Sequence, residues 1–155
     1  LNVKALEKES GSFGFELLAM PVPLNAAKAL IPESLPELAQ SLKRRQTDWL
    51  YIPTGTTLQV NRIALTNAAL EARLPSFAAT ERFVSFANGL AGLVCRYYSI
   101  GQFTGFKAEQ ILRGMKPEAI PVQTLNRFSF IINMRTANAL RFYPPLSMLS
   151  YAETV

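Results

Sequence analysis

Residues 89–114 have the sequence Gly-Leu-Ala-Gly-Leu-Val-Cys-Arg-Tyr-Tyr-Ser-Ile-Gly-Gln-Phe-Thr-Gly-Phe-Lys-Ala-Glu-Gln-Ile-Leu-Arg-Gly. The first part, 89–95, is a short apolar run rich in small residues, which predicts a closely packed strand. From Tyr97 onward, apolar residues recur at helical spacing until Gly114 and Pro117 stop the pattern, which predicts a helix over 97–113. A strand that leads directly into a long helix is the unit from which α/β sheets are built.

The same alternation extends in both directions from this stretch. Apolar runs bounded by glycine or proline predict strands at 15–22, 48–53, 74–78, 89–95 and 128–132. Helical patterns predict helices at 2–10, 36–45, 58–73, 80–86, 97–113 and 135–142. Because helices separate the strands and right-handed crossovers are strongly preferred, most strands should pair in parallel. The sequence therefore predicts a single three-layer α/β domain over residues 1–155, with a mostly parallel sheet flanked by helices.

The composition is that of a folded domain. Of 155 residues, 49% are hydrophobic and 17% are charged, which supplies a core and excludes a disordered segment. The longest uncharged runs, such as 83–95, are shorter than the roughly 18 residues of a membrane-spanning helix. Cys95 is the single cysteine, so the fold is not a disulfide scaffold.

The missing residue types restrict the chemistry. The chain contains no histidine, which removes Ser-His and Cys-His nucleophiles and the commonest metal ligand. No two carboxylates stand at a spacing that suggests acid/base catalysis. We therefore expect a protein that is not an enzyme and that has no metal and no cofactor.

The net charge of +5 arises entirely after residue 53. The arginines and lysines there are spread singly, whereas nucleic-acid-binding segments usually cluster them, so no nucleic-acid partner is expected. Lys43-Arg44-Arg45 is the one basic run, and it lies at a predicted helix C-terminus, where cations offset the helix dipole.

Polar residues follow three of the predicted strands. Pro53-Thr54-Gly55-Thr56-Thr57 follows the first of them, Thr80-Glu81-Arg82 the second and Arg96-Tyr97 the third. The carboxyl ends of parallel strands meet at one edge, and ligands bind there in open α/β sheets. We therefore expect one ligand-binding rim formed by Thr54, Gly55, Thr56, Thr57, Thr80, Glu81, Arg82, Arg96 and Tyr97.

These residue types suit a polar or anionic ligand group. Threonine hydroxyls and helix N-terminal amides donate hydrogen bonds, an arginine can hold a carboxylate with two of them, and Tyr97 can stack on a ligand. Each also has a structural alternative, in which Thr56 or Thr57 caps the next helix, the arginines are simply exposed and the tyrosine packs in the core. The threonine loop lacks Gly-Lys-Ser/Thr and is not a phosphate loop.

The chain opens on a helical pattern, whereas a doubly wound sheet normally begins with a strand. This order predicts that the native polypeptide extends upstream and that these residues are its C-terminal part. An open strand position and the apolar side of the helix at 97–114 would then lie exposed. For that reason we expect the isolated lobe to form a homodimer.

The quoted stretch 89–114 resembles a segment of bacterial ABC-transporter substrate-binding proteins of the type I periplasmic-binding-protein fold, the group that includes aromatic amino-acid binders. Lys116-Pro-Glu-Ala-Ile-Pro-Val-Gln, Phe128-Ser-Phe-Ile-Ile-Asn-Met-Arg-Thr-Ala-Asn-Ala-Leu140 and Pro144-Pro145-Leu-Ser-Met-Leu are similar to later motifs of that family. Asp48-Trp-Leu-Tyr-Ile-Pro-Thr and Leu74-Pro-Ser-Phe-Ala correspond upstream.

The resemblance implies two α/β lobes that close on a small solute. This chain would supply the second lobe, and segment 97–125 would cross to the missing first lobe. A membrane permease of an ABC transporter is the implied partner, and a periplasmic or extracellular location, anchored or free, is the implied setting. A ligand-sensing regulatory domain of a signalling protein is the alternative, and the upstream gene sequence would distinguish the two.

Two departures from the family pattern fall in the predicted rim. The family's Asp-Asn after Pro-Thr is replaced by Gly55-Thr56, and its Tyr-Gly-x-Asp is replaced by Leu93-Val94-Cys95-Arg96. Arg96 thus reverses the charge of an acidic residue that would face a ligand amino group. We therefore expect an anionic or amino-acid-like solute and single out Arg96 as the residue that decides the ligand's charge.

Overall fold

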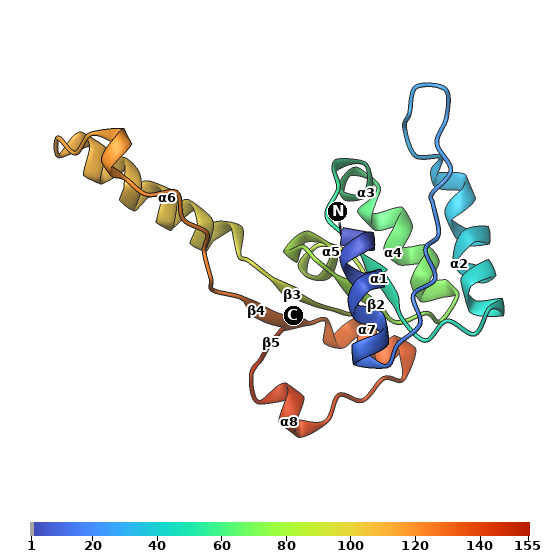
Figure 1. Ribbon diagram of the computed structural model, residues 1–155. Coiled ribbons are helices and arrows are strands. Elements are labelled where there is room, and N and C mark those ends of the chain that lie inside the picture. Colours follow the sequence, from blue (N-terminus) through green and yellow to red (C-terminus); the bar gives the residue numbers. More distant parts are fainter. Residues whose placement is uncertain (1) are drawn as a thin grey trace.

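A computed structural model describes residues 2–155 of the chain (Figure 1). Its strands are β1 (Leu50–Ile52), β2 (Ser76–Ala78), β3 (Ala91–Val94), β4 (Ser129–Ile132) and β5 (Ala152–Thr154). Its α-helices are α1 (Asn2–Phe13), α2 (Leu35–Arg44), α3 (Thr56–Val60), α4 (Arg62–Glu71), α5 (Glu81–Ser85), α6 (Tyr97–Leu112), α7 (Met134–Leu140) and α8 (Leu146–Leu149). Short 3-10 helices cover Pro32–Ser34 and Pro117–Ala119.

The five strands form one sheet in the order β1-β2-β3-β4-β5. Pairing is parallel between β1 and β2, β2 and β3, and β4 and β5, whereas β3 and β4 are antiparallel. The mostly parallel sheet is therefore confirmed, as are the predicted strands at 48–53, 74–78, 89–95 and 128–132. Gly92 explains the tight β2–β3 contact, because a Cβ at this position would lie 2.5 Å from the Ala78 carbonyl oxygen.

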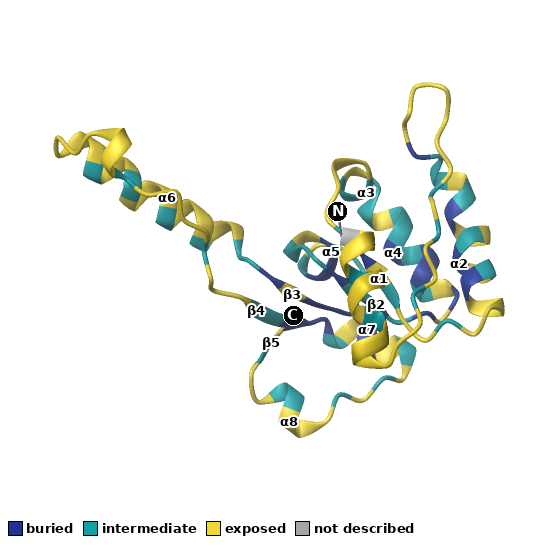
Figure 2. Cartoon of the chain, viewed as in Figure 1, coloured by how far each residue is buried: buried dark blue, intermediate teal, exposed yellow. Residues whose placement is uncertain are grey.

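Helices pack on both faces of the sheet, as a three-layer fold requires. Alternate strand residues point to opposite faces. Ile131 packs with Phe83 and Val84 of α5 on one face, and Ile132 packs with Ala137 of α7 on the other. Figure 2 shows the buried positions concentrated on the strands and on the inner sides of the helices beside them.

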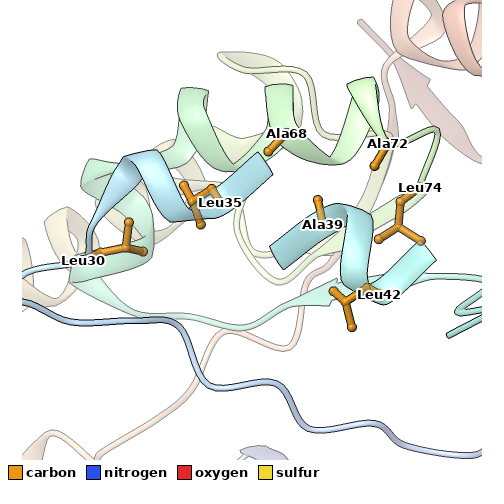
Figure 3. Close-up of a cluster of buried hydrophobic side chains, with 7 residues drawn as sticks. All are labelled: Leu30, Leu35, Ala39, Leu42, Ala68, Ala72 and Leu74. Carbon is orange, nitrogen blue, oxygen red and sulfur yellow. The ribbon is translucent and has the colours of Figure 1, made fainter. Parts of the chain in front are cut away.

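A further hydrophobic cluster joins α2 to α4 at the β1 end of the sheet (Figure 3). Leu35, Ala39 and Leu42 lie one helical turn apart and form the buried stripe of α2. They pack against Ala68 and Ala72, and small residues there let the two helices approach closely.

Three predicted elements need correction. No strand forms at 15–22, because this extended segment has no neighbouring strand to pair with; the one bridge nearby joins Leu24 and Leu30. The helix predicted at 58–73 is two helices, α3 and α4, interrupted at Asn61. Helix α1 continues past Gly11 to Phe13. Strand β5 and helix α8 were not predicted.

Helix α6 projects away from the sheet, and residues 115–128 return along it (Figure 1). We call α6 and this return segment the arm. None of the residues of α6 is buried, although several are large and apolar, with Leu112 87% exposed. A cavity of about 670 Å³ lies between α6 and the return segment. Over residues 2–155, no helix is both long and apolar enough to cross a membrane.

Candidate functional site

The three predicted polar segments lie at one edge of the sheet. Strands β1, β2 and β3 run in the same direction, so their carboxyl ends lead into Thr54–Thr57, Thr80–Arg82 and Arg96–Tyr97 on the same side. We call these three segments the rim. The antiparallel strand β4 begins beside the end of β3, with Ser129 opposite Val94, and β5 begins next to it. The start of β5 therefore also lies at the rim.

The threonine loop presents unused hydroxyl groups. Gly55 is the N-cap of α3, and no side chain caps this helix. Thr54, Thr56 and Thr57 are exposed. Within residues 2–155 their hydroxyls make no hydrogen bond. The capping alternative for Thr56 and Thr57 is therefore wrong, and the three hydroxyls are free to contact a ligand.

Thr80 is tied to the loop before it by a residue that the sequence analysis missed. The side-chain amide of Gln59, on α3, donates a hydrogen bond to the Thr80 hydroxyl at 2.8 Å. This contact connects the segment after β1 to the segment after β2. No motif in the sequence marks Gln59, and only its hydrogen bond to Thr80 places it at the rim.

Arg96 is bound by two carboxylates. One guanidinium nitrogen donates to Glu81 at 2.7 Å, and the other donates to Glu153 of β5. The side chains of Glu81, Arg96 and Glu153 are 14%, 30% and 45% exposed. The second oxygen of Glu81 faces the backbone N–H of Tyr97 at 3.4 Å. Arg96 therefore fastens the end of β3 to the start of α5 and to β5.

The ionisation of this cluster follows from its contacts. Burial alone would lower the pKa of Arg96, but the hydrogen bonds and charges of Glu81 and Glu153 raise it above its ordinary value. A hydrogen bond from Ser129 lowers the pKa of Glu153 most, burial opposes this, and Arg96 and then Arg127 lower it further. Arg96 is accordingly a cation and Glu153 an anion at neutral pH.

The remaining predicted rim residues point to solvent. Arg82 is exposed and forms no ion pair within residues 2–155. Tyr97 is exposed rather than in the core. The structure thus joins Glu81, Arg96 and Tyr97 by direct contacts and Thr80 to Gln59, while Thr54–Thr57 and Arg82 share only the same edge with them. Among the described residues, no three metal-ligating side chains come together.

A mostly parallel sheet with polar segments gathered at the carboxyl ends of its strands is the arrangement in which open α/β domains bind ligands. A family model described as ABC transporter substrate binding protein matches residues 18–155. The chain belongs to this family of ABC transporter substrate binding proteins, which are binding proteins rather than enzymes.

A curated relative, described as a tyrosine-binding protein from Clostridioides difficile (strain R20291), is 33% identical over 93 residues, which are 60% of this chain and 27% of that protein. The solved ABC domain in complex with L-Trp from Streptococcus pneumonia has a TM-score of 0.78 at 21% identity, and it covers 99% of this chain and 49% of its own. A conserved domain protein from Vibrio cholerae matches with a TM-score of 0.77 at 23% identity and the same coverage. The structural matches establish the fold, and this chain spans about half their length.

Proposed function

We propose that this chain is the second lobe of the solute-binding component of an ABC import system, and that it binds an amino-acid-like solute at the rim. The observation that carries the proposal is the gathering of three polar segments at the carboxyl ends of β1, β2 and β3 in a member of this family. The named ligands of two relatives, tyrosine and L-Trp, support an amino-acid-like solute. The rim forms one wall of the cleft, and a first lobe reached through 97–125 forms the other.

The contacts of Arg96 argue against its use as the receptor for a ligand carboxylate. Both terminal nitrogens of the guanidinium already donate to Glu81 and Glu153. A ligand carboxylate would have to displace one of these groups and would place a third negative charge beside the same cation. Arg96 therefore positions Glu81 and the start of α6 and is not the anion receptor that the charge reversal alone suggests.

The working partners follow from the same proposal. The lobe pair releases its solute to a membrane permease of the transporter, and it works in the periplasm or at the extracellular surface. The arm supports this arrangement, because an apolar helix without a single buried residue needs a cover. In the whole protein, the first lobe supplies that cover.

Calorimetry on the whole gene product tests the proposal. We expect L-tryptophan or L-tyrosine to bind more tightly than succinate. The variant Thr56→Val, which removes a free rim hydroxyl, should weaken binding roughly two- to tenfold, the value of one hydrogen bond. Thr47→Val is the matched control, because Thr47 precedes β1 at the opposite edge of the sheet. Absence of binding by all three solutes, or equal effects of the two variants, contradicts the proposal.

A further inference from the structure

Two buried polar atoms beside the rim have no hydrogen-bond partner. They are the Oε1 atom of Gln59, which is an acceptor, and the Nε–H group of Arg62, which is a donor. Both residues are half-buried, and Arg62 forms no ion pair within residues 2–155. Buried polar groups in folded proteins are almost always hydrogen-bonded, so these two atoms require an explanation.

Hydrogen bonds connect both residues to the rim. The side-chain amide of Gln59 donates to Thr80 at 2.8 Å, and a terminal nitrogen of Arg62 donates to the main-chain carbonyl of Gln59 at 3.2 Å. Arg62 is the first residue of α4, and long helical side chains point back toward the helix N-terminus. That direction leads to α3 and the threonine loop. The guanidinium of Arg62 therefore lies on the rim side of α4, one contact removed from Thr80.

Arg62 differs from the two cations that belong to the rim segments. Both terminal nitrogens of Arg96 already donate to carboxylates. Arg82 is exposed, and water weakens the interactions of a charge in such a position. Arg62 is half-buried, is held at one terminal nitrogen and pairs with no carboxylate among the described residues. An anion beside Arg62 therefore meets a charge that is less screened and still available.

We propose that Arg62 binds the carboxylate of an amino-acid solute and that Oε1 of Gln59 accepts a hydrogen bond from its ammonium group. The inference rests on the proposed function and names the residues that recognise the charged end of the solute. An amino acid carries an acceptor and a donor on the same carbon, and these match the open donor of Arg62 and the open acceptor of Gln59. A simple anion satisfies only the first. Both side chains turn toward the cleft when the solute binds, because Nε and Oε1 are buried in the lobe alone.

The two contacts also determine which related solutes bind weakly. The primary amide of an amino acid keeps the ammonium group and loses the anion that Arg62 binds. The des-amino acid keeps the carboxylate and loses the donor that faces Gln59. Each analogue should bind more weakly than the parent amino acid, and each loss should disappear when the matching side chain is replaced, as in a double-mutant cycle.

Calorimetry on the whole gene product tests the contact of Arg62. The probes are L-tryptophan, or L-tyrosine if it binds more tightly, and the primary amide of the same amino acid. In the wild type we expect the amino acid to bind roughly ten- to a hundredfold more tightly than its amide, the value of a charged hydrogen bond. Arg62→Gln should reduce this ratio to about threefold or less, whereas Arg73→Gln, exposed beyond the other end of α4, should leave it unchanged. The ratio is taken within each variant, so a change in stability does not imitate the effect.

The des-amino analogue tests the contact of Gln59 in the same way. For L-tryptophan this analogue is indole-3-propionate, which has the ring and the carboxylate without the ammonium group. Gln59→Met should reduce the preference for the amino acid several-fold, and Gln40→Met, exposed on α2, should not. An unchanged preference in Gln59→Met overturns the ammonium contact. Thermal melting of every variant confirms that it is folded.

The outcomes separate this inference from the proposed function. If an amino acid binds the wild type but Arg62→Gln and Arg73→Gln show the same ratio, the assignment of Arg62 is wrong and the proposed function stands. A ratio that falls in Arg82→Gln instead assigns the carboxylate to the exposed arginine and also overturns the assignment. If no amino acid binds the wild type, both proposals fail.

Discussion

Replacement of Arg96 by alanine should mainly destabilise the domain. It should have less effect on which ligand charge the rim prefers. Arg96 is the cation that pairs with both Glu81 and Glu153, which come from different elements of the fold. The variant Arg96→Ala removes both ion pairs and leaves two carboxylates near each other. The end of β3, the start of α5 and β5 lose the group that joins them.

The size of the effect follows from solvent exposure. The pair with Glu81 is the more enclosed, and a hydrogen bond between charged groups, discounted for partial exposure, contributes about 1–2 kcal/mol. The pair with Glu153 is half exposed and contributes about 0–1 kcal/mol. We therefore expect Arg96→Ala to lower the free energy of unfolding by about 1–3 kcal/mol, or the melting temperature by about 2–12 °C for a domain of this size.

Urea denaturation with a matched control measures this difference. The control is Arg113→Ala, because Arg113 pairs with Glu109 on the exposed surface of α6 at 2.7 Å. An exposed pair of this kind contributes about 0.5 kcal/mol or less. If both variants unfold at the same urea concentration, the Arg96 cluster has no structural role and the argument against an anion receptor loses its basis.

The effect of Arg96→Ala on stability should also depend on pH, in a direction that the contacts of Glu153 determine. Because the pKa of Glu153 is lowered in the folded protein, by Ser129 first and also by Arg96, its contribution to stability is complete above the ordinary value of 4.5. That contribution is lost as the pH falls through the folded value. The difference in stability between wild type and Arg96→Ala should therefore narrow as the pH falls below that ordinary value and through the lower, folded one. A difference that stays constant from pH 7 to pH 3 would contradict the assigned contact.

Three other predictions concern the sheet. Gly92→Ala should cost about 1–3 kcal/mol of stability, because its Cβ would meet the Ala78 carbonyl at 2.5 Å, whereas Gly105→Ala in the open part of α6 should be neutral or stabilising in the same denaturation assay. Asn133→Ala should cost about 2–4 kcal/mol in thermal unfolding, because the buried side chain caps α7 and donates to two carbonyls. Residues 1–155 alone should dimerise in light scattering, and Tyr51→Lys should shift them toward monomer.

Local signals account for the parts of the fold that the sequence predicts well. The runs at 89–95 and 128–132 are apolar and bounded by turn residues, and each forms a strand because a neighbour is present. The run at 15–22 has the same local pattern but no strand beside it, and local pattern alone does not supply a partner. Strand β5 is short, mostly exposed and marked by no apolar run, so pairing with β4 is what defines it.

The rim, too, is predictable from the sequence in part and depends on distant partners for the rest. Its three segments are predictable because parallel strands must place their carboxyl ends together. The ion pairing of Arg96 is not predictable from the sequence, because one of its two partners, Glu153, lies on β5, a strand that the sequence does not reveal. A charge reversal at one position indicates a ligand's charge only when the surrounding charges are known, and here two carboxylates alter that conclusion.

The antiparallel pairing of β3 with β4 determines how the arm is attached. The chain leaves the sheet at Val94 and returns at Ser129, and these two residues are register partners on adjacent strands. Because these two attachment points lie on adjacent, hydrogen-bonded strands, the arm joins the sheet at a single place. Arg96 lies two residues beyond Val94, so its ion pairs with Glu81 and Glu153 fasten the base of the arm to the sheet.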